Sequence, residues 1–274
     1  MSPLHRCLCV LVLALLGACA TTPEQDEPEK VYYERAREAL NRGNFSEAIT
    51  QLEALDARYP FGRYAEQAQL DMIYARYRSL EPETAIIAAE RFIRLNPQSP
   101  HVDYAYYIKG LANYYADVSL GARYFSVDAD ARDPGRQRDA FNDFNQLVTS
   151  FPDSPYAADA AQRMIAIKNR LAAYELKVAR YYIKREAYVA AAERAKYVVQ
   201  HLPETPAAPD ALALLVELYQ VLGLNEQSDN MKQVLVASYP NHASLDENQE
   251  FIGREVIREN RSLKGVLTFG WLED

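Results

Sequence analysis

The side chains that carry most enzyme chemistry are sparse or unsuitably spaced in this 274-residue chain. The three histidines beyond the first few residues, His101, His201 and His242, each stand close to a proline. Aspartates cluster at 128–133, but this stretch lacks the glycine and the distal glutamate of a calcium-binding loop. No stretch matches a zinc-protease, serine-hydrolase or phosphate-loop motif. We therefore predict a protein that is not an enzyme and that has no cofactor and no metal.

Tyrosine is the side chain whose abundance indicates a function, because the chain has 20 of them. A tyrosine offers a large apolar ring face and a hydroxyl that can meet a backbone group, which suits the capture of an extended or amphipathic peptide. The alternative is that these rings only pack between helices. The two interpretations are distinguished by the elements that carry the tyrosines.

A helical repeat that ends in proline would position them. In the stretch AITQLEALDARYP, Ala48, Leu52, Leu55 and Pro60 stand at offsets 0, 4, 7 and 12. The first three offsets fall on one face of a helix, and the proline cannot continue that helix. The same spacing returns in Ala85, Ala89, Phe92 and Pro97, in Ala140, Phe144, Leu147 and Pro152, in Ala191, Ala195, Val198 and Pro203, and more faintly in Ser228, Lys232, Leu235 and Pro240.

This spacing fits the 34-residue tetratricopeptide (TPR) repeat, which has small residues at fixed positions and a terminal proline. The register places Ala36, the Gly43-Asn44 bend and Gly110 where the repeat requires small or turn residues. We predict an all-α, TPR-like superhelical solenoid of five helix-turn-helix repeats. An irregular helical bundle, the alternative, would not require proline at a fixed offset from a small residue.

Two repeats are longer than the others. In the third repeat, residues 117–135 contain glycine, proline, aspartate and aromatic residues, and they predict an ordered insertion between two helices. In the fourth, the first helix runs from about Pro155 to Arg185 without an internal proline or glycine. Such a helix would span roughly 45 Å. We expect it either to protrude past its neighbours or to brace two halves of the solenoid.

In a TPR the concave groove is lined by positions 2, 5, 9, 12 and 13 of each first helix, called groove positions below. Tyrosine occupies seven of these fifteen positions in the first three repeats: Tyr33, Tyr74, Tyr77, Tyr104, Tyr107, Tyr114 and Tyr115. The groove positions of the last two repeats contain no tyrosine and are Ala173, Leu176, Arg180, Ile183, Lys184, Asp210, Ala213, Glu217, Gln220 and Val221. We therefore predict that the amino-terminal repeats bind peptide.

The first 18 residues have the pattern of a signal peptide, with His5 and Arg6 followed by a short apolar run. Leu16-Gly17-Ala18-Cys19 resembles a bacterial lipobox, which predicts cleavage before Cys19 and acylation of its thiol. The alternative is an ordinary signal peptide that happens to contain a cysteine. Because Ala20 rather than aspartate follows the cysteine, we expect a lipid-anchored protein on the periplasmic face of the outer membrane.

The predicted organisation has five parts: a signal peptide at 1–18, a lipidated flexible tether at 19–30, repeats one to three at 31–152, repeats four and five at 153–240, and a tail at 241–274. Removing the signal peptide takes one Arg from the 30 basic residues and leaves the 38 acidic ones, for a net charge of −9. The chain has no basic stripe of the kind that binds nucleic acid. The tail, which carries Trp271, is predicted either to fray or to dock.

The lipobox, the repeats and several longer strings together resemble a known family. The strings are ITQLEALDARYPFG, RFIRLNP, DYAYYIKGL, YFSVDADARDP and AYELKVARYY. They are similar to the BamD family, called ComL in some bacteria, which are TPR lipoproteins of the outer-membrane β-barrel assembly (BAM) machinery. The resemblance covers about residues 19–240.

The resemblance implies specific partners and roles. The amino-terminal repeats would receive the carboxy-terminal β-signal of unfolded outer-membrane proteins, and the chain would join BamA and other BAM lipoproteins. It implicates Tyr59 and Tyr181 in client contact, and Arg194 in docking on the last POTRA domain of BamA. Two departures are Phe45 in place of a tryptophan and Glu186 in place of a helix-ending glycine. The competing hypothesis is a TPR scaffold lipoprotein that organises peptidoglycan or protease enzymes.

Overall fold

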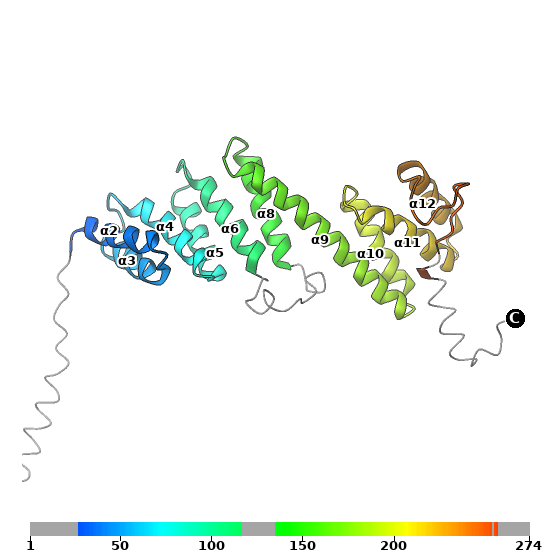
Figure 1. The fold of residues 1–274 in the computed structure, drawn as a ribbon, viewed down its shortest axis with the longest axis horizontal. Coiled ribbons are helices and arrows are strands. Elements are labelled where there is room, and N and C mark those ends of the chain that lie inside the picture. The colour runs from blue at the N-terminus through cyan, green and yellow to red at the C-terminus, as the bar shows by residue number, and fades with distance from the viewer. Residues whose placement is uncertain (1–26, 117–134, 254, 257–274) are drawn as a thin grey trace, which may run out of the picture. The chain divides into compact units, whose positions relative to one another are not determined.

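The computed structural model describes residues 27–116, 135–253 and 255–256 of the chain. These residues are helical, with no strand in the described ranges, and the predicted all-α, TPR-like class is confirmed (Figure 1). The signal peptide, Cys19, most of the tether, the insertion in the third repeat and Trp271 lie outside the described residues. The chain divides into two compact units, Met1–Ala75 and Arg76–Asp274, with the boundary inside one helix.

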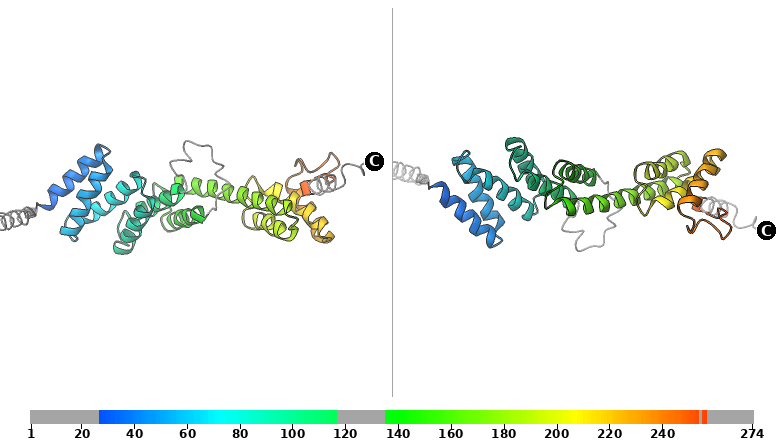
Figure 2. Two further views of the ribbon diagram at one scale, coloured as in Figure 1. Left: turned by 90° about the horizontal axis from the view of Figure 1, so that it is seen from below. Right: turned by 90° about the horizontal axis from the view of Figure 1, so that it is seen from above.

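The helices follow one another as pairs along the chain. Their bounds are α2 (Glu29–Asn41), α3 (Phe45–Arg58), α4 (Ala65–Arg78), α5 (Pro82–Leu95), α6 (Val102–Ala116), α8 (Gly135–Ser150), α9 (Ala157–Lys184), α10 (Tyr188–His201), α11 (Ala208–Val221) and α12 (Asn225–Ser238). In the first unit α2 packs against α3. In the second unit, from α5 to α12, each helix packs against the next (Figure 2).

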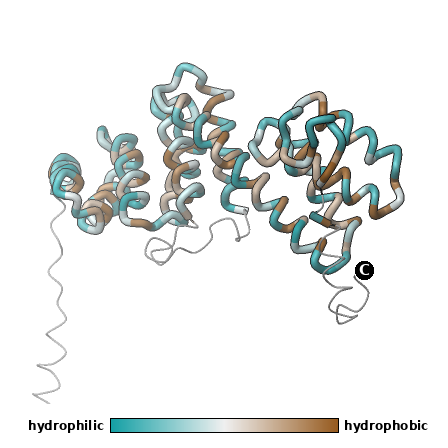
Figure 3. The backbone as a smooth tube through the Cα atoms, turned by 45° about the vertical axis from the view of Figure 1, so that its right-hand side comes forward, coloured by the Kyte–Doolittle hydropathy of each residue, from teal (hydrophilic) through white to brown (hydrophobic). Residues whose placement is uncertain are grey.

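The proline landmarks end helices as the spacing predicts. Each second helix stops two residues before its proline, as α3 stops at Arg58 before Pro60. The N–H of the next residue still bonds the carbonyl four residues back, as Tyr59 does to Leu55 at 2.8 Å. The residues at offsets 0, 4 and 7 are fully buried in the first four repeats. The apolar faces that they form alternate with polar stretches along the chain (Figure 3).

The fifth repeat departs from this pattern. Ser228 is buried and its hydroxyl donates to the Val216 carbonyl at 3.0 Å, which satisfies its polar atom inside the core. Lys232 occupies the middle position, is only partly buried, and its Nζ lies 2.5 Å from the Glu250 carboxylate. The fainter repeat pattern thus corresponds to a helix whose middle position binds the tail.

Gly110 permits close packing in the third repeat. A Cβ atom at this position would lie 2.5 Å from the ring of Phe144, which is fully buried. The glycine therefore lets α6 and α8 approach each other, as the TPR register predicts for a small residue.

Four first helices end in the same turn, in which the residue at the turn has a positive φ. The turn residues are Gly43, Leu80, Glu186 and Gly223, with φ between 58° and 73°. At the end of α9 the N–H of Glu186 bonds the Ile183 carbonyl and the N–H of Ala187 bonds the Tyr182 carbonyl, the pattern of a Schellman motif. The structure therefore shows how α9 ends at Lys184 although glutamate replaces the glycine.

We predict that Glu186→Gly stabilises the chain. A non-glycine residue in the left-handed region costs roughly 1–2 kcal/mol, and the substitution removes this cost. Part of the gain is offset because glycine makes the unfolded chain more flexible. We expect a rise of about 0.5–1 kcal/mol in the free energy of unfolding, measured by urea denaturation. The matched control is Gly223→Glu in the equivalent turn after α11, which should lower the free energy of unfolding. A loss of stability from Glu186→Gly would contradict the prediction.

The long helix α9 has 28 residues, close to the predicted bounds. It packs against α8 as well as α10. Of the two outcomes that the sequence left open, bracing is therefore the one observed in the second unit. The helix joins the second helix of the third repeat, α8, to the second helix of the fourth, α10.

Candidate peptide-binding site

A cluster of tyrosines lies where α6 meets the start of α9. We call Tyr104, Tyr107, Tyr114, Tyr115 and Tyr156 the tyrosine patch. The rings of Tyr107 and Tyr156 are stacked, with centroids 4.7 Å apart and planes 16° apart. Tyr104 also contacts Tyr156, and Tyr114 meets Tyr115 edge-on at 5.0 Å. All five rings are partly or well exposed, so they form a surface rather than part of the fully buried core.

One ion pair of α9 fixes the orientation of this patch. The Tyr107 hydroxyl donates to Asp159 Oδ2 at 2.8 Å, and Arg163 Nε donates to the same oxygen at 2.5 Å. Arg163 Nη1 also donates to the Tyr115 hydroxyl at 3.1 Å, and its guanidinium lies over the Tyr114 and Tyr115 rings. Because Asp159 and Arg163 are four residues apart on one helix, their side chains lie on the same face.

The electrostatics of the patch follow from these contacts. Burial and the hydrogen bond to Asp159 raise the pKa of Tyr107 to about 12. Burial pushes the pKa of Asp159 upward, but hydrogen bonds from Arg163 and Tyr107 outweigh it and hold that pKa below its ordinary value. Burial also raises the pKa of Tyr77, with a further contribution from Tyr115. At neutral pH Tyr77 and Tyr107 therefore keep their hydroxyl protons, and the Tyr107 hydroxyl lies beside the Asp159–Arg163 ion pair.

We predict that the free energy of unfolding of Tyr107→Phe falls less at alkaline pH than that of the parent chain. The pKa of Tyr107 lies above its ordinary value of 10.0, so the folded state keeps a proton that the unfolded state loses. This contribution is complete below pH 10 and is lost as the pH rises toward 12. At pH 7 the variant should lose about 1 kcal/mol with its hydrogen bond. Urea denaturation at several pH values between 7 and 11 should show the two proteins converging; a constant difference would contradict the prediction.

In the first unit the predicted tyrosines are held by their own neighbours. Tyr33 stacks on Tyr64 with centroids 4.5 Å apart, and Tyr74 meets Phe45 edge-on at 6.1 Å. Tyr59 follows the end of α3, and its hydroxyl donates to the Glu27 carbonyl at 2.9 Å. All three predicted tyrosines of this unit are partly buried, so each has an exposed part and a packing role.

Asp71 is a buried acid beside Tyr33 in this unit. Its Oδ1 accepts hydrogen bonds from Gln67 Nε2 at 3.0 Å and from Arg37 Nη1 at 3.5 Å. Its other oxygen is buried, and no group among the described residues bonds it. Burial raises the pKa of Asp71, and the nearby carboxylate adds to the burial that raises the pKa of Tyr33. Arg37 and Gln67 are groove positions, so the first unit also carries polar groups at the predicted site.

Tyr181 is not brought to the tyrosine patch. It lies near the end of α9, is 53% exposed, and contacts Tyr182 and the guanidinium of Arg185. Asp159 is 22 residues earlier on the same helix, which is about 33 Å at the usual helical rise. The structure thus separates Tyr181 from the patch, although both are candidates for peptide contact.

Arg194 of α10 forms an ion pair with a buried carboxylate. Its Nη1 lies 3.0 Å from Glu175 Oε2, and Arg138 of α8 reaches the other Glu175 oxygen at 3.3 Å. The Glu175 side chain is 3% exposed, whereas both arginines are nearly half exposed. The hydrogen bond to Glu175 raises the pKa of Arg194. Arg194 is therefore held in one orientation with part of its guanidinium still accessible.

Sequence reasoning missed Tyr156, Asp159 and Arg163. The repeat register places the fourth first helix at 172–184, so the first half of α9 received no groove positions. The signal was available in the unusual length of the predicted helix and in the Asp-x3-Arg pair near its start. Among the described residues no group of three or more His, Cys, Asp or Glu side chains could hold a metal ion. In the same ranges no helix has the length and apolar character needed to span a membrane.

Comparison with known proteins decides the family. Residues 25–235 match a family model named YfiO and described as outer membrane lipoprotein. This chain belongs to the YfiO family. The match covers the helices named above, α2 to α12, except the last three residues of α12, and it ends before the tail.

Curated relatives of this YfiO member are named outer membrane protein assembly factor BamD, so the predicted resemblance is confirmed. The Vibrio cholerae protein is 42% identical over 228 residues, which is 82% of this chain and 95% of that protein. A Neisseria meningitidis serogroup A protein is 40% identical over 234 residues, covering 82% and 87%. A Xylella fastidiosa protein is 35% identical over 249 residues, covering 89% and 85%.

Proposed function

We propose that this chain acts without catalysis as a subunit of the outer-membrane β-barrel assembly machinery, where it binds unfolded barrel proteins and docks on BamA. Membership of an outer membrane lipoprotein family and the name of its relatives support the general role. The finer roles of particular residues rest on the geometry of the second unit.

The client segment that fits the tyrosine patch is the aromatic carboxy-terminal β-signal of an unfolded barrel protein. Such a segment is extended, so alternate side chains face one surface while its backbone groups remain unpaired. The patch offers ring faces for the apolar side chains, and hydroxyls for the backbone. The observation that carries this proposal is the exposure of these rings while Asp159 and Arg163 hold two of them in place.

BamA docking is assigned to the surface around Arg194. A guanidinium held by a buried carboxylate loses little side-chain freedom on binding, and its remaining N–H groups can bond a carboxylate or carbonyl of a POTRA domain. Other BAM lipoproteins would bind elsewhere on the chain. Anchoring is assigned to Cys19, whose acyl chains would hold the protein at the periplasmic face of the outer membrane.

Site-specific photo-crosslinking tests the client site. A photoreactive residue at Tyr104 or Tyr115 should crosslink a synthetic β-signal peptide, and the same residue at Tyr197, an exposed tyrosine of α10, should not. Equal crosslinking at all three positions would contradict the assignment. Co-purification of BamA with the lipidated chain tests the complex, because a scaffold for peptidoglycan or protease enzymes would not recover BamA. Mass spectrometry of the amino-terminal peptide tests acylation of Cys19.

A further inference from the structure

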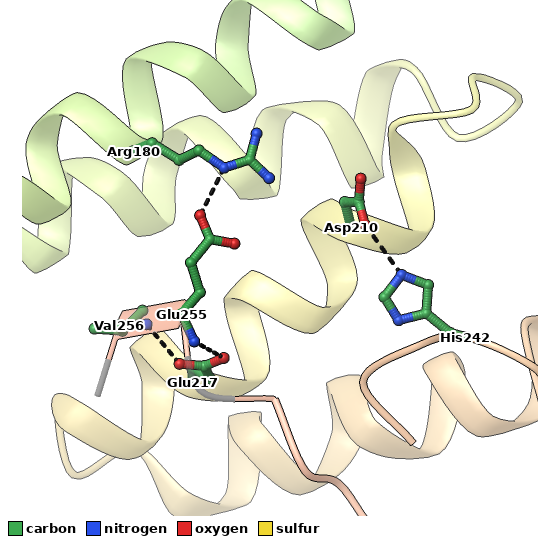
Figure 4. Close-up of polar contacts among 6 residues, drawn as sticks. All are labelled: Arg180, Asp210, Glu217, His242, Glu255 and Val256. Carbon is green, nitrogen blue, oxygen red and sulfur yellow. Dashed lines mark hydrogen bonds and ion pairs between the residues drawn. The ribbon is translucent and has the colours of Figure 1, made fainter. Parts of the chain in front are cut away.

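The described residues of the tail from His242 onward, 242–253 and 255–256, contact groove positions of the last two repeats. The Glu255 carboxylate pairs with Arg180 Nε of α9 at 2.6 Å, and the His242 ring nitrogen lies 3.1 Å from the Asp210 carboxylate of α11. The backbone N–H groups of Glu255 and Val256 donate to the two oxygens of Glu217 at 2.8 and 2.7 Å (Figure 4). Arg180, Asp210 and Glu217 are all groove positions of the repeat register.

Glu217 is the main receptor for this segment. Its side chain lies in a run of α11, residues 211–218, that is buried throughout. Burying a carboxylate is costly unless hydrogen bonds compensate, and charge-assisted bonds from two backbone N–H groups are strong compensation. These N–H groups come from the tail, so the carboxylate would lose both of these bonds without it.

Apolar contacts complete the docking. Leu245 joins the buried cluster formed by Leu212, Ala213 and Leu235, and Phe251 packs against the same cluster. Val256 has no exposed surface. Gly253 passes so close that a Cβ would lie 2.5 Å from the Phe251 ring and 3.0 Å from Glu217 Oε1. The backbone therefore approaches the receptor carboxylate as closely as a bound peptide would.

The segment also has an internal structure that presents it in this form. Asp246 accepts N–H bonds from Asn248 and Glu250 and closes a tight turn, while Leu245 and Phe251 form an antiparallel bridge. Lys232 of α12 pairs with Glu250, whose backbone N–H belongs to this turn. All of these tail residues lie beyond residue 235, where the family match ends. The segment is thus attached to the shared fold rather than part of its repeats.

We infer that residues 242–253 and 255–256 belong to a ligand in cis: a peptide of the chain itself that occupies the groove positions of the last two repeats and excludes client segments from them. The exclusion of clients rests on the proposed function, whereas occupation by the tail does not. The groove positions of the last two repeats, which contain no tyrosine, would then bind the tail. This would leave client segments the groove positions of the first three repeats, which carry all of the groove tyrosines.

Cleavage of the folded chain tests the cis ligand. A protease site placed at the exposed Asn241 lets the complete protein fold before the tail is cut, and size-exclusion chromatography then measures how much of the fragment 242–274 stays bound. We expect retention in the parent and at least a tenfold weaker hold in Glu217→Ala. Gly253→Ala should also weaken it, because the new Cβ has no room. The control Glu226→Ala removes an exposed carboxylate of α12 and should leave retention unchanged.

Folding failure is separated from loss of the contact by a second measurement. Hydrogen exchange of the uncut Glu217→Ala chain should show faster exchange at residues 245–256 while α9 and α11 remain protected. Immediate release of the fragment from the parent, or equal retention in Glu217→Ala and Glu226→Ala, would overturn the inference.

A client peptide tests the exclusion. Titration with a synthetic β-signal peptide should find one class of site on the uncut chain, and a second, weaker class after the tail has been cut and removed by dilution. Unchanged stoichiometry would overturn the exclusion. A peptide that binds neither form would refute the proposed function and the exclusion together, while fragment retention would still decide whether the tail is a ligand.

Discussion

Replacing Tyr104 and Tyr107 together by alanine should reduce the affinity of the chain for a β-signal peptide by about 100-fold. Each substitution removes a ring from the tyrosine patch, and a loss of about 1.4 kcal/mol for each buried part of an aromatic contact gives 100-fold for the pair. Tyr156, which stacks on Tyr107 and contacts Tyr104, would also lose its support. Fluorescence anisotropy with a labelled peptide measures the effect directly.

The matched control for this double variant is Tyr197→Ala, which removes an exposed ring of α10 outside the patch. It should leave peptide affinity unchanged within a factor of two or so, as expected for a residue outside the contact. Asp159→Asn should fall between the two, because it keeps the rings and loses the carboxylate that orients Tyr107 and Arg163. If the control weakened binding as much as the double variant, the patch would not be the site.

Arg194→Ala should reduce recovery of BamA at least tenfold while leaving client binding intact. The arginine that remains, Arg138, still pairs with Glu175, so the buried carboxylate is not left without a partner. We therefore expect a modest cost in stability, about 1–2 kcal/mol, together with at least a tenfold loss of BamA in co-purification.

Arg138→Ala is the control that separates docking from stability, because it removes the other partner of the same carboxylate. It should cost a similar amount of stability and retain BamA. Removing both arginines should cost about 3–5 kcal/mol, since an uncompensated charge would remain buried. Adding Glu175→Leu to that double variant should restore most of the loss. Equal loss of BamA in the two single variants would show that docking depends on stability alone.

The repeat architecture could be read from the sequence because its signals are local. A proline five residues after a buried apolar position ends a helix whatever surrounds it, and all five predicted ends are found. The need for a small residue at Gly110 could be predicted in the same way, because the repeat register requires one there. The structure gives the reason, since the Phe144 ring leaves no room for a Cβ atom.

The candidate site was harder to predict from the sequence because it depends on contacts between residues far apart in the chain. Tyr107 could be selected by its place in the register, but its partners Tyr156 and Asp159 come from a part of α9 that the register leaves out. The pairing of Arg194 with Glu175 required the packing of α10 on α9. Docking of the tail could not be decided from sequence at all, since its key contacts join backbone N–H groups to the Glu217 carboxylate.

The unbroken course of α9 has a consequence for how the second unit unfolds. Asp159 and Arg163 stand in its first turns, and Glu175 and Arg180 follow further along the same rod. A helix without an internal glycine or proline tends to unfold cooperatively, because losing one turn removes hydrogen bonds from the next. Local unfolding near Asp159 and Arg163 should therefore also raise amide exchange near Glu175 and Arg180. Client binding and BamA docking would then depend on the stability of the same helix.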